Sequence, residues 1–465
     1  MKITVIGTGY LGAVHAAGMA ALGHDVLGVD TDPEKIARLR DGDAPFFEPG
    51  LPELLRRSVS AGSLRFTTSL DEAAAFGEVH FVCVGTPQLA GSDRADLRFV
   101  DAVVAGLASR MTAPGLIVGK STVPVGTARR LAQLVRDAAR PGVDIDLAWN
   151  PEFLREGFAV EDTLHPDRLV FGTDTAAAAE VLRRVYEPVL ESGTPLFVTD
   201  LETAELVKVA ANSFLAMKIS FINAMAEVCE TVGADVATLA DAIGHDARIG
   251  RRFLNAGVGF GGGCLGKDIR AFRARGEELG VGDALTFLRE ADRINDRRRQ
   301  RVVDLAVEAL GGRLDGRRVG VLGAAFKPNS DDVRDSPALH VARELHRLGA
   351  EVTVHDPAAI ENARRAAPEL RYSHSVADTA GDADLVVHLT EWAEYREFDP
   401  ALLGTATTAS PTATRTVIDA RNGLDSAVWN AAGWDVLTLG RPPAPAWSTT
   451  SIDEPAATQA EKAAA

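Results

Sequence analysis

The residues best suited to chemistry lie in one glycine-rich stretch, Gly259–Asp268, which reads GFGGGCLGKD. Four of its first five residues are glycine, and Cys264 follows them directly. Glycine lets a backbone turn sharply and pass close to a ligand, so the thiol is presented where reacting groups can reach it. Lys267 and Asp268 come next, and a nearby cation favours the nucleophilic thiolate. The stretch therefore indicates a nucleophilic cysteine with a charged pair beside it.

The other two cysteines indicate packing rather than chemistry. Cys83 lies in the apolar run Val79–Val84 and Cys229 lies on a helical pattern, so both are expected to be buried and inert. Three cysteines at irregular spacing form neither a disulfide framework nor a zinc-binding pattern. We therefore expect a reduced, cytoplasmic protein without a metal site.

A second chemical motif stands at the N-terminus. A strand predicted for Lys2–Ile6 runs into GTGYLG at 7–12, a helix is predicted for Ala13–Leu22, and a strand at Asp25–Val29 ends at Asp30. A Gly-x-Gly-x-x-Gly turn between strand and helix seats a dinucleotide pyrophosphate on helix N–H groups. An acidic residue after the second strand takes the ribose hydroxyls and favours NAD over NADP. The predicted NAD contacts here are Gly7, Gly9, Tyr10, Leu11, Gly12 and Asp30.

Polar residues follow further apolar runs, at the strand ends where parallel sheets bind ligands. They are Thr86 after Val79–Val84, Ser121 and Thr122 after Leu116–Gly119, and Glu152 and Glu156 after Ile145–Trp149. Ordinary loop and helix-cap chemistry explains such hydroxyls equally well. The two carboxylates share one face if their segment is helical. Lys35, five residues past Asp30, either lies over the cofactor phosphate or is solvated.

The middle of the chain predicts one long helix. Residues 202–230 contain no Gly or Pro and carry apolar side chains at helical spacing. Lys208 and Asn212 are four residues apart and project to the same side. A second series of alternating strands and helices follows from Arg317 to Asn422 without an intact dinucleotide motif.

These patterns predict an α/β protein with two doubly wound Rossmann-like domains joined by a long central helix. Residues 1–199 form the NAD-binding domain, 200–300 the central dimerisation region with the cysteine loop, and 301–440 a second nucleotide-binding domain. Residues 441–465, rich in Pro, Ala, Ser and Thr, are predicted to be a disordered tail.

The net charge of the chain limits the classes of partner that it can bind. The 465 residues include 49 basic and 65 acidic side chains, a net charge of −16, which argues against a nucleic-acid partner. Helix N-termini and a few local Arg and Lys still suffice for a small anionic ligand. No stretch reaches the roughly 18 apolar residues of a membrane helix, so no membrane partner is expected.

The motifs occur in an order that resembles the UDP-glucose 6-dehydrogenases of the UDP-glucose/GDP-mannose dehydrogenase superfamily. They read GTGYLG, VGTP, KSTVPVGT, NPEFLREG, LVKVAANSFLAMKISFINAMAE, RIG, GFGGGCLGKD, GAAFKPNSDDVRDSP and IDARN. The resemblance extends to about residue 440, and the set of motifs is highly specific for the superfamily. NPEFLREG and the stretch from RIG to GFGGGC favour the UDP-glucose branch.

This resemblance implies oxidation of a sugar C6 alcohol to a carboxylate by two molecules of NAD+. Cys264 would hold the intermediate aldehyde as a thiohemiacetal and then as a thioester. Lys208 would stabilise developing oxyanion charge, with Asn212 beside it. Proton transfer and water activation would fall to Asp268, Glu152 and Thr122.

The resemblance also implies two sets of binding residues and a homodimer. NAD would contact Asp30, Lys35, Thr86, Ser121, Thr122, Glu156, Lys267 and Arg334. A UDP-sugar would be held by Glu152, Phe153, Leu154, Arg155, Lys208, Asn212, Asn255, Phe260, Gly261, Phe326, Lys327 and Arg421. Arg248 would reach into the site of the neighbouring subunit.

Two positions depart from the family pattern, whose loop is close to Gly-Gly-Ser-Cys-x-Pro-Lys-Asp. Gly263 precedes the cysteine and Gly266 precedes the lysine, which makes the loop more pliable and bears on sugar preference. The alternatives are a dehydrogenase of GDP-mannose or a UDP-N-acetylhexosamine, and a non-catalytic nucleotide-binding protein. A two-electron 3-hydroxyacid dehydrogenase shares the first domain but has no use for Cys264.

Overall fold

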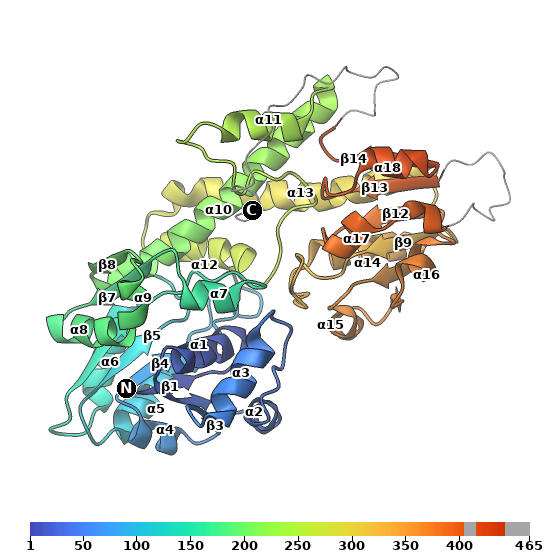
Figure 1. Ribbon diagram of the computed structural model, residues 1–465. Coiled ribbons are helices and arrows are strands. Elements are labelled where there is room, and N and C mark those ends of the chain that lie inside the picture. The colour runs from blue at the N-terminus through green and yellow to red at the C-terminus, as the bar shows by residue number, and fades with distance from the viewer. Residues whose placement is uncertain (404–414, 442–465) are drawn as a thin grey trace.

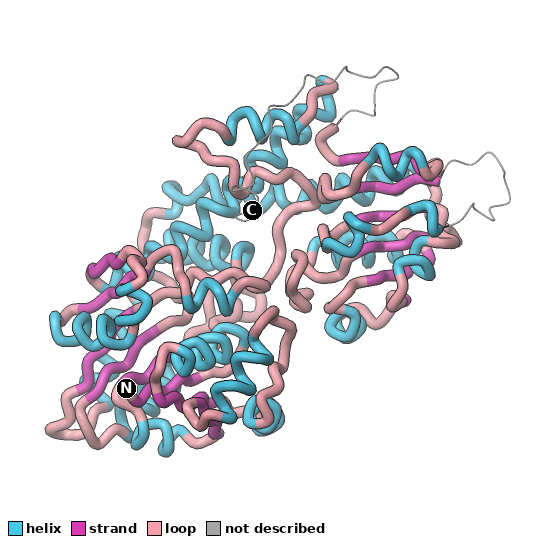
Figure 2. The backbone as a smooth tube through the Cα atoms, viewed as in Figure 1, coloured by secondary structure: helices cyan, strands magenta, loops and turns pink. Residues whose placement is uncertain are grey.

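The computed structural model describes residues 1–403 and 415–441 and contains two sheets joined by a long helix (Figure 1). The predicted fold class is therefore confirmed. The predicted tail lies outside the described residues except for Arg441. Figure 2 shows helices packed on both sides of the strands in each half of the molecule.

The first sheet has the strand order β3-β2-β1-β4-β5-β6-β7-β8, and among the described strands of this sheet the β6–β7 pairing alone is antiparallel. Its strands are β1 (Lys2–Ile6), β2 (Asp25–Val29), β3 (Leu64–Thr67), β4 (Val79–Val82), β5 (Gly115–Gly119), β6 (Ile145–Trp149), β7 (Leu169–Thr173) and β8 (Leu196–Thr199). The central strands are near-continuous apolar runs because helices cover both of their faces.

Nine helices accompany this sheet and bury separate apolar clusters on its two faces. They are α1 (Tyr10–Ala21), α2 (Pro33–Arg40), α3 (Leu51–Ser60), α4 (Leu70–Phe76), α5 (Arg98–Arg110), α6 (Thr127–Ala138), α7 (Ala159–Leu164), α8 (Ala176–Val185) and α9 (Glu187–Glu191). Helices α1, α3 and α7 pack together on one face, and α4, α5 and α6 on the other.

The second sheet is wholly parallel in its described strands, in the order β11-β10-β9-β12-β13-β14. They are β9 (Arg318–Leu322), β10 (Glu351–His355), β11 (Arg371–Tyr372), β12 (Leu385–His388), β13 (Arg415–Asp419) and β14 (Trp434–Thr438). Its helical elements are α14 (Pro337–Arg347), α15 (Ile360–Ala366), α16 (Val376–Ala380), α17 (Ala393–Glu397), η2 (Pro400–Leu403) and α18 (Ser426–Ala431).

The helix α10 (Leu201–Val232) connects the two halves. Asp200 caps its first turn by accepting from the Thr203 amide, and Gly233 ends it in a left-handed conformation, φ +74°. The helices α12 (Leu265–Glu278) and α13 (Thr286–Ala309) pack along it, and α13 continues into the core of the second sheet. The central region is completed by α11 (Val236–Gly244) and η1 (Gly282–Leu285).

By length and composition alone, α10 could cross a membrane, contrary to the expectation that no stretch is apolar enough. Among the buried polar side chains of this helix are nevertheless Glu205, Lys208 and Asn212. Each is paired with another part of the chain. That face of α10 is therefore packed against protein.

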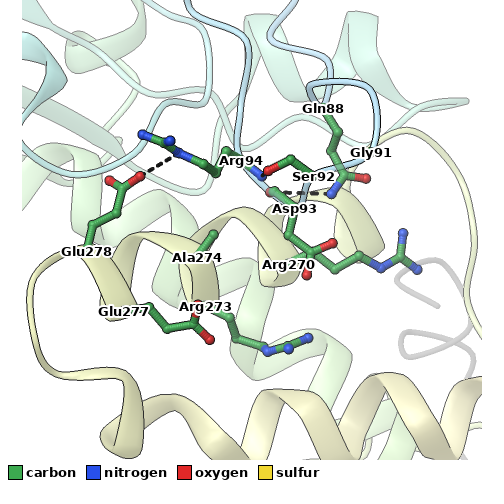
Figure 3. A pocket seen from close by; sticks show the side chains of 10 residues that line it. All are labelled: Gln88, Gly91, Ser92, Asp93, Arg94, Arg270, Arg273, Ala274, Glu277 and Glu278. Atoms are coloured by element: carbon green, nitrogen blue, oxygen red, sulfur yellow. Dashed lines mark hydrogen bonds and ion pairs between the residues drawn. The ribbon is translucent and has the colours of Figure 1, made fainter.

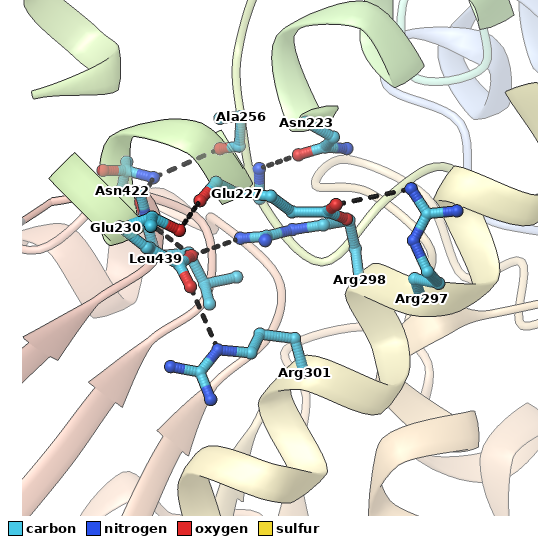
Figure 4. Close-up of polar contacts among 12 residues, drawn as sticks. Asn223, Glu227, Glu230, Ala256, Arg297, Arg298, Arg301, Asn422 and Leu439 are labelled. Carbon is cyan, nitrogen blue, oxygen red and sulfur yellow. Dashed lines mark hydrogen bonds and ion pairs between the residues drawn. The ribbon is translucent and has the colours of Figure 1, made fainter. Parts of the chain in front are cut away.

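A polar cluster ties the C-terminal half of α10 to the second sheet (Figure 4). The Glu230 carboxylate accepts from Arg298 Nη2 at 2.9 Å, from Arg301 Nε at 3.0 Å and from the Gly440 amide at 3.0 Å. Asn422 donates to the carbonyls of Ala256 and Leu439, at 3.2 and 3.1 Å. The segment that leads into the cysteine loop is thereby anchored to the second domain.

Candidate active site

Cys264 is the N-cap residue of α12, at the end of a loop that lies flush against the second domain. The amide of Gly262 donates to the Arg334 carbonyl at 2.9 Å. A Cβ on Gly261 would lie 2.2 Å from the Asp335 carbonyl oxygen, so this close approach requires glycine. The loop is therefore positioned by backbone contacts rather than by its own side chains.

The prediction that nearby cations favour the Cys264 thiolate is wrong. Burial raises the pKa of the thiol to about 12, Asp268 and Glu152 add to this rise, and Lys208 opposes it only in part. Lys267 does not help because its Nζ lies 2.7 Å from Asp268 Oδ1 and is neutralised there. Protein atoms surround the sulfur, but the side chain remains open to solvent. The Cys264 side chain is therefore a protonated, accessible thiol.

Two buried contacts converge on this thiol from α10. Lys208 Nζ lies 2.9 Å from Glu152 Oε1, and Asn212 Nδ2 donates to Asp268 Oδ2 at 2.7 Å. Lys208 and Asn212 thus share one face of the helix, as their spacing predicts. Burial disfavours the Lys208 ammonium, but the negative charge of Glu152 and its neighbours outweighs burial and raises its pKa.

The hydroxyl groups at the strand ends join neighbouring strands. Thr86 Oγ1 donates to the Thr122 carbonyl at 2.7 Å, and Ser121 Oγ donates to the Val84 carbonyl at 2.6 Å. Two roles were predicted for these hydroxyl groups, contact with a ligand or support of the local structure. Their hydrogen bonds correspond to the structural role. Cys83 and Cys229 are buried, as expected.

The first βαβ unit fits a dinucleotide. No side chain caps the N-terminus of α1, so its first N–H groups are left for an anion. A Cβ on Gly9 would meet open space, whereas one on Gly12 would lie 1.7 Å from the Gly7 carbonyl oxygen, so Gly12 allows helix and turn to touch. The Tyr10 hydroxyl faces away and donates to Glu48.

Asp30 stands at the end of β2, where the ribose of NAD is predicted to bind. Burial opposes its ionisation, but hydrogen bonds from Lys35 Nζ and the Asp32 amide outweigh burial and lower the Asp30 pKa. Lys35 lies 2.9 Å from Asp30 Oδ2, which places it at the cofactor edge rather than free in solvent.

Glu152 and Glu156 do not share a helix face, because residues 151–158 form an irregular loop. Glu156 lies instead against the second domain, where Ser330 Oγ donates to it at 3.2 Å and Arg334 Nη2 lies 3.5 Å away. Burial and the charge of Asp332 raise the Glu156 pKa to about 7, against the opposing effect of Arg334.

The predicted sugar-nucleotide residues divide into two groups. The first group faces the region around Lys208 or Glu156. The Phe153 ring packs 5.6 Å from Lys208 Nζ. The Lys327 side chain lies over Phe326, and Glu156 and Cys264 are close enough to Lys327 to act on it electrostatically. Leu154 follows Glu152 and donates its amide to that carboxylate at 2.8 Å.

The second group is already engaged within the protein. The Phe260 amide and carbonyl both bond to Asn295, and Arg421 donates to the carbonyls of Gly259 and Phe326. Three others pair with neighbours: Arg155 with Asp162, Asn255 with Arg251, and the exposed Arg248 with Asp246.

Sequence reasoning missed two groups that hold the cysteine loop. Asn295 and Arg299 on α13 are buried, and both bond to Phe260. Their four-residue spacing on a charged helix is the same signal that identified Lys208 and Asn212. Arg168 was also missed; its guanidinium stacks 3.8 Å from the centre of the Phe153 ring.

A separate open groove of about 730 Å³ lies between residues 88–94 and α12 (Figure 3). Arg94 bridges it to Glu278 at 2.6 Å, and Arg270, Arg273 and Glu277 line its other wall. None of the predicted catalytic side chains lines this groove.

Comparison with known protein families matches three regions of the chain to three domains of one family. Family models for the UDP-glucose/GDP-mannose dehydrogenase family match as the NAD binding domain at residues 1–190, the central domain at 202–297 and the UDP binding domain at 320–426. A UDP-glucose 6-dehydrogenase of Rhizobium meliloti is 41% identical over 95% of this chain and 100% of its own length. One of Pseudomonas aeruginosa is 38% identical over 95% and 98%.

Solved structures agree in fold. A UDP-glucose dehydrogenase from Pyrobaculum islandicum has a TM-score of 0.86 and 39% identity, covering 95% of this chain and 98% of its own. A UDP-D-ManNAc dehydrogenase from Pyrococcus horikoshii has a TM-score of 0.81 and 26% identity, covering 95% and 99%.

The dinucleotide site on the first sheet and the second doubly wound domain facing it define an NAD-dependent dehydrogenase. The chain belongs to the UDP-glucose/GDP-mannose dehydrogenase family.

The glycine contacts of the loop lead to a first prediction. Gly261→Ala should lower the free energy of unfolding by about 1–3 kcal/mol, because its Cβ meets backbone. It should also reduce kcat by roughly 100-fold, since the loop that carries the thiol shifts. Gly266→Ala is the matched control, because its Cβ meets side chains rather than backbone, Asp335 at 3.1 Å and Arg270 at 3.4 Å. Urea unfolding and steady-state rates measure both effects; equal effects of the two changes contradict the assignment.

A second prediction concerns Glu156. As pH rises from 6 to 8 the carboxyl ionises and becomes a stronger acceptor at its predicted contact with NAD, so the KM for NAD+ should fall. In Glu156→Gln this pH dependence should disappear, while Glu161→Gln on α7 should keep it. A wild-type KM that is flat over this range contradicts the role.

The same residue makes a stability prediction of opposite sign. The folded-state pKa is raised from 4.5 to about 7, so wild-type stability should decline relative to Glu156→Gln as pH rises through 7, by at most about 3 kcal/mol. Thermal unfolding of both proteins at pH 5 and pH 8 checks this.

Proposed function

We propose that this protein oxidises UDP-glucose at C6 to UDP-glucuronate, with two NAD+ each accepting one hydride. The observation that carries the proposal is the accessible Cys264 thiol among Lys208, Asp268 and Glu152, between two nucleotide-binding domains. Relatives named UDP-glucose 6-dehydrogenase, at 37–41% identity over nearly the whole chain, support the choice of sugar.

In the first oxidation the C6 hydroxyl gives up its proton and C6 gives up a hydride, leaving an aldehyde. Because the Cys264 pKa is high, its thiol must lose a proton as sulfur bonds to C6. Asp268 and Glu152 are the carboxylates placed to take that proton. The aldehyde oxygen gains a proton in turn, and the product is a thiohemiacetal.

In the second oxidation the thiohemiacetal loses a hydride from C6 and its hydroxyl proton, which gives a thioester. Water then adds to the thioester carbonyl, and the C–S bond breaks to release the carboxylate and restore the Cys264 thiol. The Lys208 ammonium, paired with Glu152 and adjacent to Asn212, stabilises the oxyanions formed at C6.

The binding residues follow from the same scheme. We assign Asp30, Lys35, Glu156, Lys267 and Arg334 to NAD, together with the first turn of α1. Phe153, Leu154, Arg155, Asn255, Phe326, Lys327 and Arg421 are assigned to the sugar nucleotide, with Arg421 acting through the loop carbonyls it holds. The reaction is placed in the cytoplasm, in keeping with three free cysteines.

A second candidate substrate is another nucleotide sugar. Gly263 and Gly266 loosen the loop next to the reacting carbon, and the Pyrococcus horikoshii protein of similar fold is named for UDP-D-ManNAc. The chemistry at Cys264 would be the same. A panel of UDP-glucose, UDP-N-acetylhexosamines and GDP-mannose distinguishes the substrates.

The stoichiometry tests the proposed chemistry. UDP-glucose should yield two NADH per sugar, and Cys264→Ser should abolish or arrest turnover because no thioester forms. Cys229→Ser, at a buried site on α10, is the control and should keep full activity. One NADH per sugar, or turnover unaffected by Cys264→Ser, would falsify the covalent route.

We also propose that the protein is a homodimer that pairs through α10. Phe214, Phe221 and Val228 are exposed and seven residues apart, so they form one apolar stripe on this helix. Pairing across this stripe would carry the exposed Arg248 toward the neighbouring subunit's site.

The stripe can be tested by mass. Phe221→Lys should convert the dimer to a monomer in light scattering, because a buried ammonium in an apolar seam is unpaired. Phe99→Lys on α5, also exposed, should leave the mass unchanged. A monomeric wild type, or a Phe221→Lys dimer, rejects this interface.

A further inference from the structure

Lys120 is a buried lysine that the scheme above does not use. It follows the last residue of β5 and is only 7% exposed. Its Nζ donates to Asn150 Oδ1 at 3.0 Å and lies 3.4 Å from the Tyr186 hydroxyl. Among residues 1–403 and 415–441 it forms no salt bridge. Burying an ammonium without a carboxylate partner costs free energy. This cost indicates that Lys120 has a specific role at its position.

Asn150 is the residue on which this ammonium acts. Its Oδ1 accepts from Lys120 and from the Tyr186 hydroxyl at 2.7 Å, its Nδ2 donates to the Val170 carbonyl at 3.0 Å, and its amide donates to the Gly119 carbonyl at 2.8 Å. The residue is 1% exposed, and hydrogen bonds hold both ends of its side-chain amide and its backbone N–H. Asn150 opens the irregular segment that carries Glu152 two residues later.

The titratable groups around Lys120 come from four elements, one of which is α1, where Lys120 adds to the effect of burial in lowering the pKa of His15. Glu152 on the irregular segment attracts the ammonium, Lys208 on α10 repels it, and the Cys83 thiol lies at the end of β4. The rings of Phe81 and Tyr186 face Nζ, each with its centre 5.9 Å away. Lys120 therefore places a second positive charge near Glu152, in addition to that of Lys208.

We propose, on the basis of the function proposed above, that Lys120 is a positioning residue for Glu152. Its ammonium fixes Asn150 by a hydrogen bond and, by its charge, holds the Glu152 carboxylate in the orientation that meets Lys208. Neutralising Lys120 then weakens the Glu152–Lys208 pair, on which oxyanion stabilisation and proton transfer depend.

This role has a pH signature. Burial lowers the pKa of Lys120 to about 8, and the repulsion from Lys208 adds to it, while Cys83 and Glu152 oppose it. Activity should thus decline as pH rises through about 8. Stability should move the other way: the folded protein binds fewer protons than the unfolded chain between about 8 and 10.5, so this site stabilises the fold increasingly as pH rises.

The test compares kcat over pH 6.5–9.5 for the wild type, Lys120→Arg and Lys120→Met. Lys120→Arg keeps a charge that does not titrate in this range, so it should retain activity and lose the decline near pH 8. Lys120→Met should lose roughly ten- to hundredfold in kcat at pH 7 and also lose the decline. The KM for the sugar nucleotide should change less than kcat.

Tyr186→Phe distinguishes the charge of Lys120 from the hydrogen bonding that holds Asn150. This change removes the other hydrogen bond to Asn150 Oδ1 and leaves the Lys120 ammonium in place. It should keep the decline near pH 8. If the decline persists unchanged in Lys120→Arg, or if Lys120→Met matches the wild type, the proposal fails. If Lys120→Met does not fold, Lys120→Arg and Tyr186→Phe still decide it.

The substrate panel is run first on the wild type, so that the two proposals fail separately. Absence of NADH from UDP-glucose rejects the proposed sugar only. The pH comparison then uses whichever nucleotide sugar of the panel is oxidised.

Discussion

The buried contact between Lys208 and Glu152 is the constraint on which the rest of the arrangement depends. An ammonium in this position is stable only if a carboxylate meets it. The helix α10 and the irregular segment after β6 must therefore keep one relative position. The neighbouring contact from Asn212 to Asp268 brings α12, and with it Cys264, into the same position. Three elements far apart in the sequence are thus held together by two polar pairs.

The glycine-rich loop Gly259–Asp268 is held in a different way. It contributes almost no side chains of its own, and its geometry is supplied by neighbours: the backbone of residues 334–335, the Asn295 amide group, and the Arg421 guanidinium. All three neighbours belong to α13 or to the second domain. The position of the thiol therefore depends on how the second domain packs against the central helices.

Sequence reasoning recovered much of this structure where one physical rule dominated. The strands Lys2–Ile6, Asp25–Val29 and Ile145–Trp149 have the predicted bounds, because buried strands of a parallel sheet are short apolar runs. The edge strand β8 was missed, since its Phe197 and Val198 are exposed and no buried run marks it. The same reasoning paired Lys208 with Asn212 by helical spacing but could not place Glu152 against Lys208, which depends on how separate elements pack.

Electrostatics was the least predictable part. Counting neighbours along the chain placed Lys267 beside Cys264, yet the fold directs that ammonium to Asp268 and surrounds the thiol with carboxylates. Net effects on a pKa depend on burial and on charges from all sides, and sequence order shows neither. The helical pairing proposed for Glu152 and Glu156 failed because their segment is irregular and its two carboxylates face different domains.

The high pKa of the Cys264 thiol has a consequence for the durability of the protein. Peroxides and most electrophiles attack thiolates, and the first step toward sulfenic acid requires one. Burial, together with the charges of Asp268 and Glu152, holds the Cys264 pKa far above neutrality, so little thiolate is present although the side chain is open to solvent. The surroundings that keep this thiol protonated therefore also protect it from oxidation.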